Sequence, residues 1–309
     1  MSALKVADLF AGAGGSSTGA TMAGCELVYA ANHWPLAVKS HAINHPGAEH
    51  YCQDLFTADW SALPDHDVLT ASPCCQGHSK ARGKADDNSE HDASRNTAFC
   101  VVDALTAKRP GAFVVENVTD FRRWSRFPEW KAAINALGYS MREYVIDAAD
   151  LGVPQHRERL FIVGNLGREA MKLRLTPRQH VPVSAVIDWD SGSWSDVYKP
   201  GRAKATIERV EAGRKVYGSR FVAPFYGSGS GKTGRSIERP IGTLTTKDRW
   251  SLIDGDRLRM FTVSEQLQIM GFPGDYTLLG TQTEQKHQLG NAVCPPVMRD
   301  ILSSIKRAA

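Results

Sequence analysis

The sequence contains little cysteine, and no two cysteines have the Cys-x-x-Cys spacing that structural zinc sites use. Six cysteines in 309 residues also give no disulfide framework of the kind that small secreted domains require. No apolar run is long enough to cross a membrane, and the N-terminus leads into a strand pattern rather than a signal peptide. We therefore expect a protein of the reducing cytoplasm, with no bound metal and no membrane association.

The net charge of +4 conceals an uneven distribution of charged residues. Residues 199–259 contain 14 Lys and Arg against 6 Asp and Glu, so the rest of the chain is slightly acidic. A basic segment on an acidic body favours a polyanionic partner that is bound mainly by that segment. A solvated basic surface without a partner is the alternative on charge alone.

Apolar runs that contain β-branched residues alternate with helix-like segments over the first half of the chain. The predicted strands are residues 4–10, 26–31, 68–71, 112–116, 139–147 and 159–165. The predicted helices are residues 16 onward, 35–44, 95–108, 129–137, 264–270 and 296–307. This alternation predicts the α/β class, with a doubly wound, mostly parallel sheet. The last two strands have no helix between them, so we expect them to form an antiparallel hairpin.

The composition changes after residue 176, where Gly, Ser, Lys and Arg become frequent and helical periodicity fades. We therefore predict three parts. Residues 1–175 form the main domain, residues 176–250 form a smaller, loop-rich domain, and residues 251–309 return to complete the main domain.

Two of the predicted strands end in residue types that carry chemistry. The strand at residues 68–71 leads into Pro73-Cys74-Cys75-Gln76-Gly77-His78-Ser79, which places a thiol in a Pro/Gly turn. The strand at residues 112–116 ends in Glu116-Asn117. A thiol and a carboxyl group at the ends of two buried strands suit a nucleophile and an acid that act on one substrate.

The first strand is followed by the glycine loop, Asp8-Leu9-Phe10-Ala11-Gly12-Ala13-Gly14-Gly15, and then by a helix. Glycines let a ligand approach the backbone, and the helix N-terminus offers N–H groups to an anion. A nicotinamide dinucleotide wants an acidic residue about 20 positions further on, where the sequence has Asn32 and His33. The loop therefore favours another nucleoside-type cofactor, with Trp34 as a stacking surface for a purine, and a purely structural turn is the alternative.

With these segments and three further blocks in the same order, the chain resembles the DNA (cytosine-5) methyltransferases. The further blocks are Gln155-His156-Arg157-Glu158-Arg159, residues 239–273 with Gly242-Thr243-Leu244-Thr245, and Gln288-Leu289-Gly290-Asn291-Ala292-Val293. They cover nearly the whole chain outside residues 176–250. The resemblance implies the doubly wound sheet of an S-adenosylmethionine-dependent methyltransferase, with residues 176–250 as its target-recognition domain.

The resemblance implies that the chain transfers a methyl group from S-adenosylmethionine to C5 of a cytosine in a specific double-stranded DNA sequence. Cys75 would add to C6 as a thiolate, because C5 is a poor nucleophile until C6 is attacked. Glu116 would hold or protonate N3, Arg159 would bind O2, and Arg157 would lie near the thiol and the carboxylate. Asn117 would brace the local backbone.

The chain departs from the family pattern beside the nucleophile. The family usually has a proline where this chain has Cys74, so two thiols are candidates. Alignment on Gln76 and Ser79 identifies Cys75 as the nucleophile and Cys74 as a packed neighbour.

The resemblance also implies the residues that bind S-adenosylmethionine and its product, S-adenosylhomocysteine. They are Phe10, Ala11, Gly12, Ala13, Gly14, Gly15, His33, Trp34, Asp54, Leu55, Asn291 and Ala292. Asp54 would accept the adenine amino group. The family carries an acidic residue for the ribose at the position of His33, so we expect weaker cofactor affinity or an acidic substitute from elsewhere.

A cytosine inside a stacked duplex is out of reach, so the target base must be flipped out. The resemblance implies that residues 77–94 close over the flipped base and that the recognition domain supplies phosphate contacts and base readout. The DNA-binding residues that it implies are Gln76, Ser79, Lys80, Arg82, Lys84 and Gln155. We expect a monomer that protects or marks bacterial or phage DNA, as restriction-modification methyltransferases do.

Three alternatives are weighed against this hypothesis. The branch of the family that methylates tRNA carries Cys-Phe-Thr, and no cysteine here precedes Phe-Thr. A catalytically weak DNA-binding protein of the same fold is disfavoured by the presence of Cys75, Glu116 and Arg159. His41 and His45 have the spacing of a zinc-protease pair, but Ala42 replaces the required glutamate, so we interpret them as packing or surface histidines.

Overall fold

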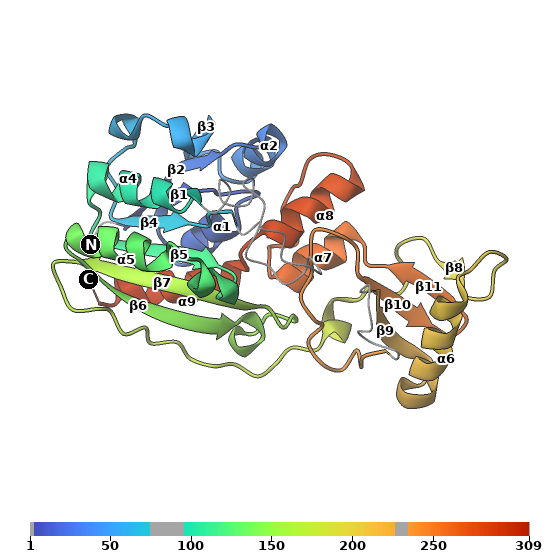
Figure 1. Cartoon of the computed structure of the whole chain (residues 1–309). Coiled ribbons are helices and arrows are strands. Elements are labelled where there is room, and N and C mark those ends of the chain that lie inside the picture. The colour runs from blue at the N-terminus through green and yellow to red at the C-terminus, as the bar shows by residue number, and fades with distance from the viewer. Residues whose placement is uncertain (1–2, 75–95, 226–233, 309) are drawn as a thin grey trace.

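The computed structural model describes residues 3–74, 96–225 and 234–308, and it contains two sheets. The larger sheet has seven strands in the order β3-β2-β1-β4-β5-β7-β6 (Figure 1). Its strands are β1 (Lys5–Leu9), β2 (Glu26–Asn32), β3 (Glu49–Cys52), β4 (Val68–Ala71), β5 (Ala112–Asn117), β6 (Tyr139–Asp147) and β7 (Glu158–Leu166). Strands β1 to β5 are parallel, and β7 is antiparallel to β5 and β6. The predicted doubly wound, mostly parallel sheet and its antiparallel hairpin are confirmed.

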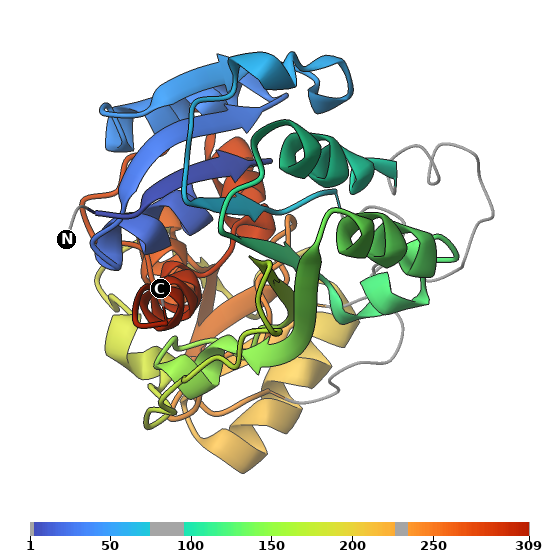
Figure 2. The same ribbon diagram turned by 90° about the vertical axis from the view of Figure 1, so that its left-hand side faces the viewer.

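Helices cover both faces of the larger sheet (Figure 2). They are α1 (Gly15–Met22), α2 (Pro35–Asn44), α4 (Phe99–Lys108), α5 (Phe127–Ala136) and α9 (Pro295–Lys306). Successive side chains of a strand point to opposite faces, and accordingly Val6 belongs to the apolar core shared with α1 and α9, whereas Leu9 belongs to the core shared with α4 and α5. Both faces of β1 and β4 are therefore buried, which explains their apolar sequences.

Short 3-10 helices connect several of these elements. They are η1 (Leu55–Thr57), η2 (Trp60–Ala62), η3 (Thr119–Arg123), η4 (Ala148–Leu151) and η5 (Val183–Val186). Within the described ranges, no helix combines the length and the apolar character that a membrane span needs.

The smaller sheet is antiparallel throughout and has the strand order β8-β11-β10-β9. Its strands are β8 (Ser195–Asp196), β9 (Arg220–Pro224), β10 (Trp250–Asp254) and β11 (Arg257–Met260). Helix α6 (Lys204–Tyr217) packs on this sheet, and Val210 of the helix shares a core with Phe221 of β9. Strands β10 and β11 extend this sheet beyond residue 250, the predicted end of the smaller domain.

Helix α6 lies within the segment that the sequence predicts to be loop-rich. Only Val210 and Gly213 of the helix are buried, so the segment carries little apolar periodicity from which a helix could be recognised.

Two further helices lie between the sheets in Figure 1, α7 (Val263–Met270) and α8 (Gln282–Asn291). Each begins with a capping box, in which a threonine and a glutamate three residues later bond to each other's backbone N–H. The pairs are Thr262 with Glu265, and Thr281 with Glu284. These caps fix the start of α8, whose C-terminal end carries the predicted cofactor residue Asn291.

Candidate active site and cofactor site

The carboxyl ends of the parallel strands bring the predicted site residues to one edge of the larger sheet. The glycine loop follows β1, His33 and Trp34 follow β2, Cys74 follows β4, and Glu116 lies near the end of β5. Open α/β sheets bind their ligands at this edge. The topology therefore assembles residues that are more than 100 positions apart in the sequence.

Glu116 and Arg159 form an ion pair at this edge. The Nε atom of Arg159 on β7 lies 3.3 Å from Oε1 of Glu116 on β5. Both side chains are largely buried, and the Nη1 atom of Arg159 also donates to the Glu158 carbonyl at 2.8 Å. The arrangement leaves a carboxyl group and a guanidinium fixed side by side, as the sequence predicts for two groups that hold one base.

The loop that carries the two cysteines is anchored to the end of β5. The Asn117 side chain donates to the Pro73 carbonyl at 3.1 Å, and its Oδ1 accepts from the Val118 N–H at 2.8 Å. The Cys74 N–H donates to the Thr97 hydroxyl at 3.2 Å, a contact that the sequence did not indicate. The prediction that Asn117 braces the backbone is confirmed, and Cys74 is held next to Glu116's strand.

Several predicted residues lie outside the described ranges. They are the nucleophile Cys75 and the DNA-binding candidates Gln76, Ser79, Lys80, Arg82 and Lys84. Their roles remain predictions.

Arg157 lies near Glu116, as the resemblance implies, but its hydrogen bonds are to the backbone. Its side chain is buried, and its guanidinium donates to the carbonyls of Leu244 at 2.9 Å, Gly290 at 2.9 Å and Ala292 at 3.0 Å. It lines a small cavity together with Glu116 and Arg159, but its hydrogen bonds join chain segments. Arg157 is therefore a positioning residue that ties the predicted recognition segment to the cofactor block.

Gln155 is also interior, and the structure corrects the prediction that it contacts DNA. Its side chain is 0% exposed and its Oε1 accepts from the Leu244 N–H at 2.6 Å. Its amide donates to the Ile269 carbonyl at 3.4 Å. A side chain enclosed in this way reaches no ligand, so Gln155 supports the same junction as Arg157.

A third cysteine, Cys294, lines the small cavity beside Glu116. Burial raises the pKa of the Cys294 thiol to about 11. The thiol therefore stays protonated near neutral pH and does not compete as a nucleophile.

The glycine loop has two parts with different roles. Phe10, Gly12 and Gly14 have positive φ angles of 57°, 54° and 96°. A Cβ atom at Gly12 would meet only the Phe10 carbonyl oxygen, at 3.9 Å, so this side of the loop is open to a ligand. A Cβ atom at Gly15 would collide with the backbone of Val293, so this glycine is needed for the loop to pack on the final block. The contact brings the final block, which contains Asn291 and Ala292, to the loop, and their binding of one cofactor remains a prediction.

The residues after β2 and β3 complete this side of the site. His33 is exposed, and the ring of Trp34 lies 5.2 Å from the ring of His287, which the sequence did not single out. The Oδ1 atom of Asp54 accepts from the Phe56 N–H at 3.0 Å, which fixes the carboxyl group at the start of η1. The side chain of Leu55 is buried in the core, so only its backbone remains for a ligand.

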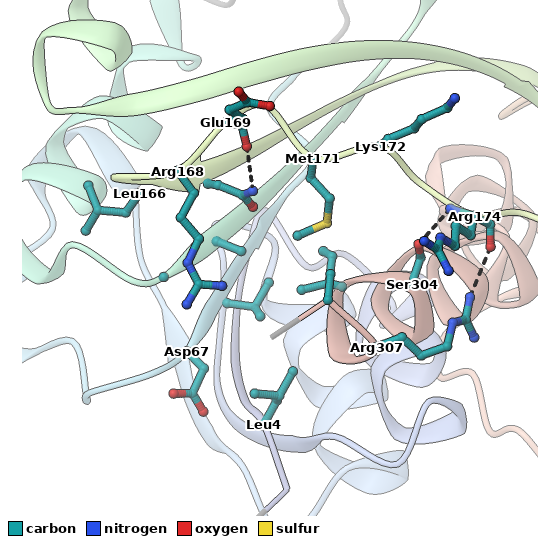
Figure 3. Close-up of a pocket in the computed structure, with 16 residues that line it drawn as sticks. Leu4, Asp67, Leu166, Arg168, Glu169, Met171, Lys172, Arg174, Ser304 and Arg307 are labelled. Atoms are coloured by element: carbon teal, nitrogen blue, oxygen red, sulfur yellow. Dashed lines mark hydrogen bonds between the residues drawn. The ribbon is translucent and has the colours of Figure 1, made fainter.

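A cavity of about 680 Å³ lies elsewhere, at the opposite edge of the sheet (Figure 3). Its lining includes Leu4 and Asp67, which precede β1 and β4, and Arg307 near the C-terminus. None of the predicted site residues that the structure describes lines it. The size of a cavity therefore does not identify the functional edge of this sheet. The positions of the predicted site residues identify it.

Comparisons with known proteins agree with this geometry. Residues 4–307 match the family described as C-5 cytosine-specific DNA methylase. The chain is 29% identical to the Type II methyltransferase M.NlaX of Neisseria lactamica, over 98% of this chain and 96% of the relative. It is 30% identical to the Type II methyltransferase M.HgiDI of Herpetosiphon aurantiacus, over 94% of this chain and 90% of the relative.

Solved structures share the fold at lower identity. A mutant of Spodoptera frugiperda DNMT2 superposes with a TM-score of 0.71 at 17% identity, covering 98% of this chain and 100% of that protein. The Entamoeba histolytica methyltransferase EhMeth superposes with a TM-score of 0.69 at 17% identity, covering 100% of both chains. Taken with the family match over nearly its whole length, the chain belongs to the C-5 cytosine-specific DNA methylases and is a DNA cytosine-5 methyltransferase.

Proposed function

We propose that the protein methylates C5 of a flipped cytosine in a specific double-stranded DNA sequence, using S-adenosylmethionine and a covalent bond between Cys75 and C6. The observation that carries this proposal is the Glu116–Arg159 ion pair, which lies beside the loop that Asn117 anchors. The carboxyl group and the guanidinium at this edge, together with the thiol that the sequence places directly after Cys74, match the groups that this reaction needs.

The chain's own residues divide the chemistry as follows. The Cys75 thiolate adds to C6, forming the S–C6 bond and raising the electron density at C5. Glu116 holds the proton at N3, so the ring does not accumulate negative charge. Arg159 orients Glu116 and the cytosine O2, where its fixed charge stabilises the transition state. After methylation, C5 gives its proton to a water molecule, and the electron pair of that C–H bond re-forms the C5=C6 double bond. The S–C6 bond breaks in this step, which regenerates the thiolate.

The cofactor site fits a nucleoside with a charged tail. Gly12 lets the ligand approach the loop backbone, Trp34 offers a ring to the adenine, and Asp54 offers a carboxylate to its amino group. S-adenosylmethionine, when bound there, supplies the methyl group. His33 offers only a neutral partner to a ribose hydroxyl, so we propose that the affinity is lower than an acidic residue would give.

Fewer basic side chains are available to DNA than the excess of Lys and Arg in residues 199–259 suggests. Arg214, Arg220, Arg257 and Arg259 form ion pairs with acidic residues of the protein, which leaves them less available to phosphate. Arg239 and Lys247 are exposed and flank Leu244, whose carbonyl Arg157 holds. We propose that these two residues contact the DNA backbone and that the protein acts as a monomer on bacterial or phage DNA in the cytoplasm.

Transfer of labelled methyl groups tests the proposal. The purified protein is incubated with labelled S-adenosylmethionine and either duplex DNA or tRNA, and the wild type is compared with Cys75→Ala and Cys74→Ala. Label in DNA that Cys75→Ala abolishes and Cys74→Ala retains is the expected result. Label that persists in Cys75→Ala would refute the nucleophile, and label in tRNA alone would refute the substrate.

A further inference from the structure

Four polar side chains form a continuous hydrogen-bonded chain behind the glycine loop. The Ser17 hydroxyl lies 2.6 Å from Oδ2 of Asp8 and 2.8 Å from Nε2 of His41. The Nδ1 atom of His41 lies 2.8 Å from Nε2 of His50. Asp8, Ser17 and His41 are buried, whereas His50 on β3 is partly exposed. The chain therefore connects solvent at His50 to a buried carboxyl group near the end of β1.

Each contact in this chain works in either direction. With Asp8 ionised, His50 donates to His41, His41 donates to Ser17, and Ser17 donates to Asp8. A proton that adds to Nδ1 of His50 lets the Nε2 proton of His50 move to His41. The Nε2 proton of His41 then moves to Ser17, and the Ser17 proton moves to Asp8. Both histidines end neutral in the opposite tautomer, and every heavy atom keeps its place.

The surroundings of the chain determine where the extra proton rests. Burial raises the pKa of Asp8 to about 6, although the hydroxyls of Ser17 and Thr70 oppose that shift. Burial lowers the pKa of His41 well below its usual value, and the neighbouring His45 and His50 lower it further. A proton taken up near pH 6 therefore rests on Asp8 and not on His41.

The pKa shifts of the other ionisable groups that face the chain all favour their neutral forms. Burial lowers the pKa of His45 to about 4 and also lowers the pKa of His50. Burial and the charge of Asp8 raise the pKa of Tyr276 above its usual value. The Thr70 hydroxyl donates to Oδ1 of Asp8 at 2.8 Å. Asp8 is the buried group of this cluster whose pKa is raised towards neutral pH.

Side chains next to this hydrogen-bonded chain also contact the glycine loop. The Tyr276 hydroxyl donates to the Ala13 carbonyl, and the Thr18 hydroxyl donates to the Gly14 carbonyl at 2.7 Å. A Cβ atom at Gly14 would lie 3.0 Å from Cδ2 of His41 and 3.2 Å from Nε2 of His45. Asp8 itself stands two residues before Phe10 in the sequence, and it accepts from Ser17 in the helix that follows the loop.

We propose that Asp8, Ser17, His41 and His50 form a proton relay that sets the charge behind the glycine loop and makes cofactor binding depend on pH. The inference rests on the proposed S-adenosylmethionine site. The sulfonium of that cofactor is positively charged, so an ionised Asp8 attracts it and a protonated Asp8 does not. The affinity is expected to fall about two- to threefold as the pH drops from 7.5 to 5.5, because most of Asp8 becomes protonated over this range and a modest Coulombic attraction at partly screened distance is lost.

The relay is tested first on the protein without cofactor. The titration of ¹³C-labelled aspartate carboxyls, with Asp8 assigned through Asp8→Asn, is compared with the ¹⁵N tautomer signals of His50. The expected result is one shared midpoint near pH 6 for Asp8 ionisation and for the His50 tautomer change. Different midpoints, or a His50 tautomer that stays constant, would overturn the relay.

Two variants separate a relay from a merely structural network. Ser17→Ala breaks the middle link, so the Asp8 midpoint rises by about one pH unit and the His50 tautomer no longer follows it. Thr70→Val removes the other hydroxyl on Asp8, so the midpoint rises while His50 still follows, and this variant also serves if Ser17→Ala does not fold. Ser184→Ala, whose hydroxyl donates to Glu238 far from the cluster, leaves both titrations unchanged as the matched control.

Calorimetry of S-adenosylmethionine binding between pH 5 and 8 tests the coupling to the loop. The affinity of the wild type is expected to fall with the same midpoint as the titration of Asp8. In Ser17→Ala the affinity is expected to fall at the higher pH to which the Asp8 midpoint moves. A dissociation constant that ignores pH would overturn the coupling. Absence of binding at every pH would refute the proposed cofactor site, whereas the titrations of the free protein would still decide the relay.

Discussion

The Nε atom of Arg159 on β7 lies 3.3 Å from Oε1 of Glu116 on the adjacent antiparallel strand β5. The pair is built by a strand reversal, because β7 inserts between β5 and β6 and so presents its start to the end of β5. A carboxyl group that must hold a proton on a base gains a fixed orientation from this guanidinium.

We expect Glu116→Gln to lower the methyl-transfer rate by about 10²- to 10⁴-fold, the usual effect of removing a general acid or base. The amide keeps the shape of the side chain but cannot deliver a proton to N3. Single-turnover rates on duplex DNA measure the effect. Glu143→Gln, which removes a carboxylate that pairs with Lys131, is the control and should keep the wild-type rate. A Glu116→Gln rate within threefold of the wild type would contradict the assignment.

Arg157→Met should lower the free energy of unfolding by about 3 kcal/mol, because three carbonyl groups lose their buried donor. Urea unfolding measures the loss. Arg168→Met, on the exposed rim of the cavity in Figure 3, should change stability by less than about 0.5 kcal/mol. Equal losses of unfolding free energy in the two variants would show that the hydrogen bonds of Arg157 do not stabilise the protein.

Gly15→Ala should destabilise the protein by about 2 kcal/mol or more, since the added methyl group meets the Val293 backbone. Gly47→Ala adds the same methyl group to open space and has no positive φ, so it should be neutral or slightly stabilising. Thermal unfolding of both variants measures the difference. The same melting temperature for Gly15→Ala and the wild type would mean that the loop does not pack on the final block.

The lowered pKa of His45 predicts that the folded protein becomes less stable as the pH falls. Charging this histidine is penalised in the folded state, so its contribution to stability is present above pH 6.5 and is lost as the pH falls towards 4. His45→Gln should therefore gain stability relative to the wild type at pH 5, with no such gain at pH 8. Urea unfolding at both pH values measures this. A stability difference that is the same at pH 5 and pH 8 would exclude the titration of His45 as the cause.

Replacing both Arg239 and Lys247 with glutamine should weaken DNA binding at 0.1 M salt and lower the salt dependence by about two counterions. Fluorescence anisotropy over a salt series measures both quantities. Lys172→Gln removes a charge at the opposite edge of the sheet and should leave both unchanged. An unchanged salt slope in the double variant would remove these two residues from the DNA surface.

The sequence predicted those strands and helices whose buried positions are occupied by a regular pattern of apolar residues. Strand β4 is buried on both faces and reads as a continuous apolar run. Strand β3 is not predicted because it is a short, mostly exposed edge strand with the sequence Glu-His-Tyr-Cys. Helix α6 is missed for the same reason, since a polar helix on a small sheet shows little of the periodicity that a buried face imposes.

The candidate site was predicted where the residue type dictates the role. Glu116 and Arg159 lie together as expected, because a strand end positions each of them. The roles of Gln155 and Arg157 could not be predicted, since their side chains bond to carbonyl and N–H groups about 90 to 135 positions away in the sequence. Nothing in a single sequence distinguishes a buried arginine from one that reaches a ligand.

The Arg157 junction has a consequence for exchanging the DNA specificity of this protein with that of a relative. The Ile241 N–H and carbonyl bond to Pro154 and His156, and the Leu244 carbonyl accepts from Arg157, so residues 236–249 are fastened to the methyl-transfer domain. Strands β10 and β11, which follow in the sequence, belong to the other sheet. Transplanting residues 176–250 as one segment would replace Leu244, whose carbonyl accepts from Arg157. It would also divide the smaller sheet, because β10 and β11 would come from a different protein than β8 and β9. The transferable unit is discontinuous, residues 187–235 together with 250–260, inserted around a retained host segment.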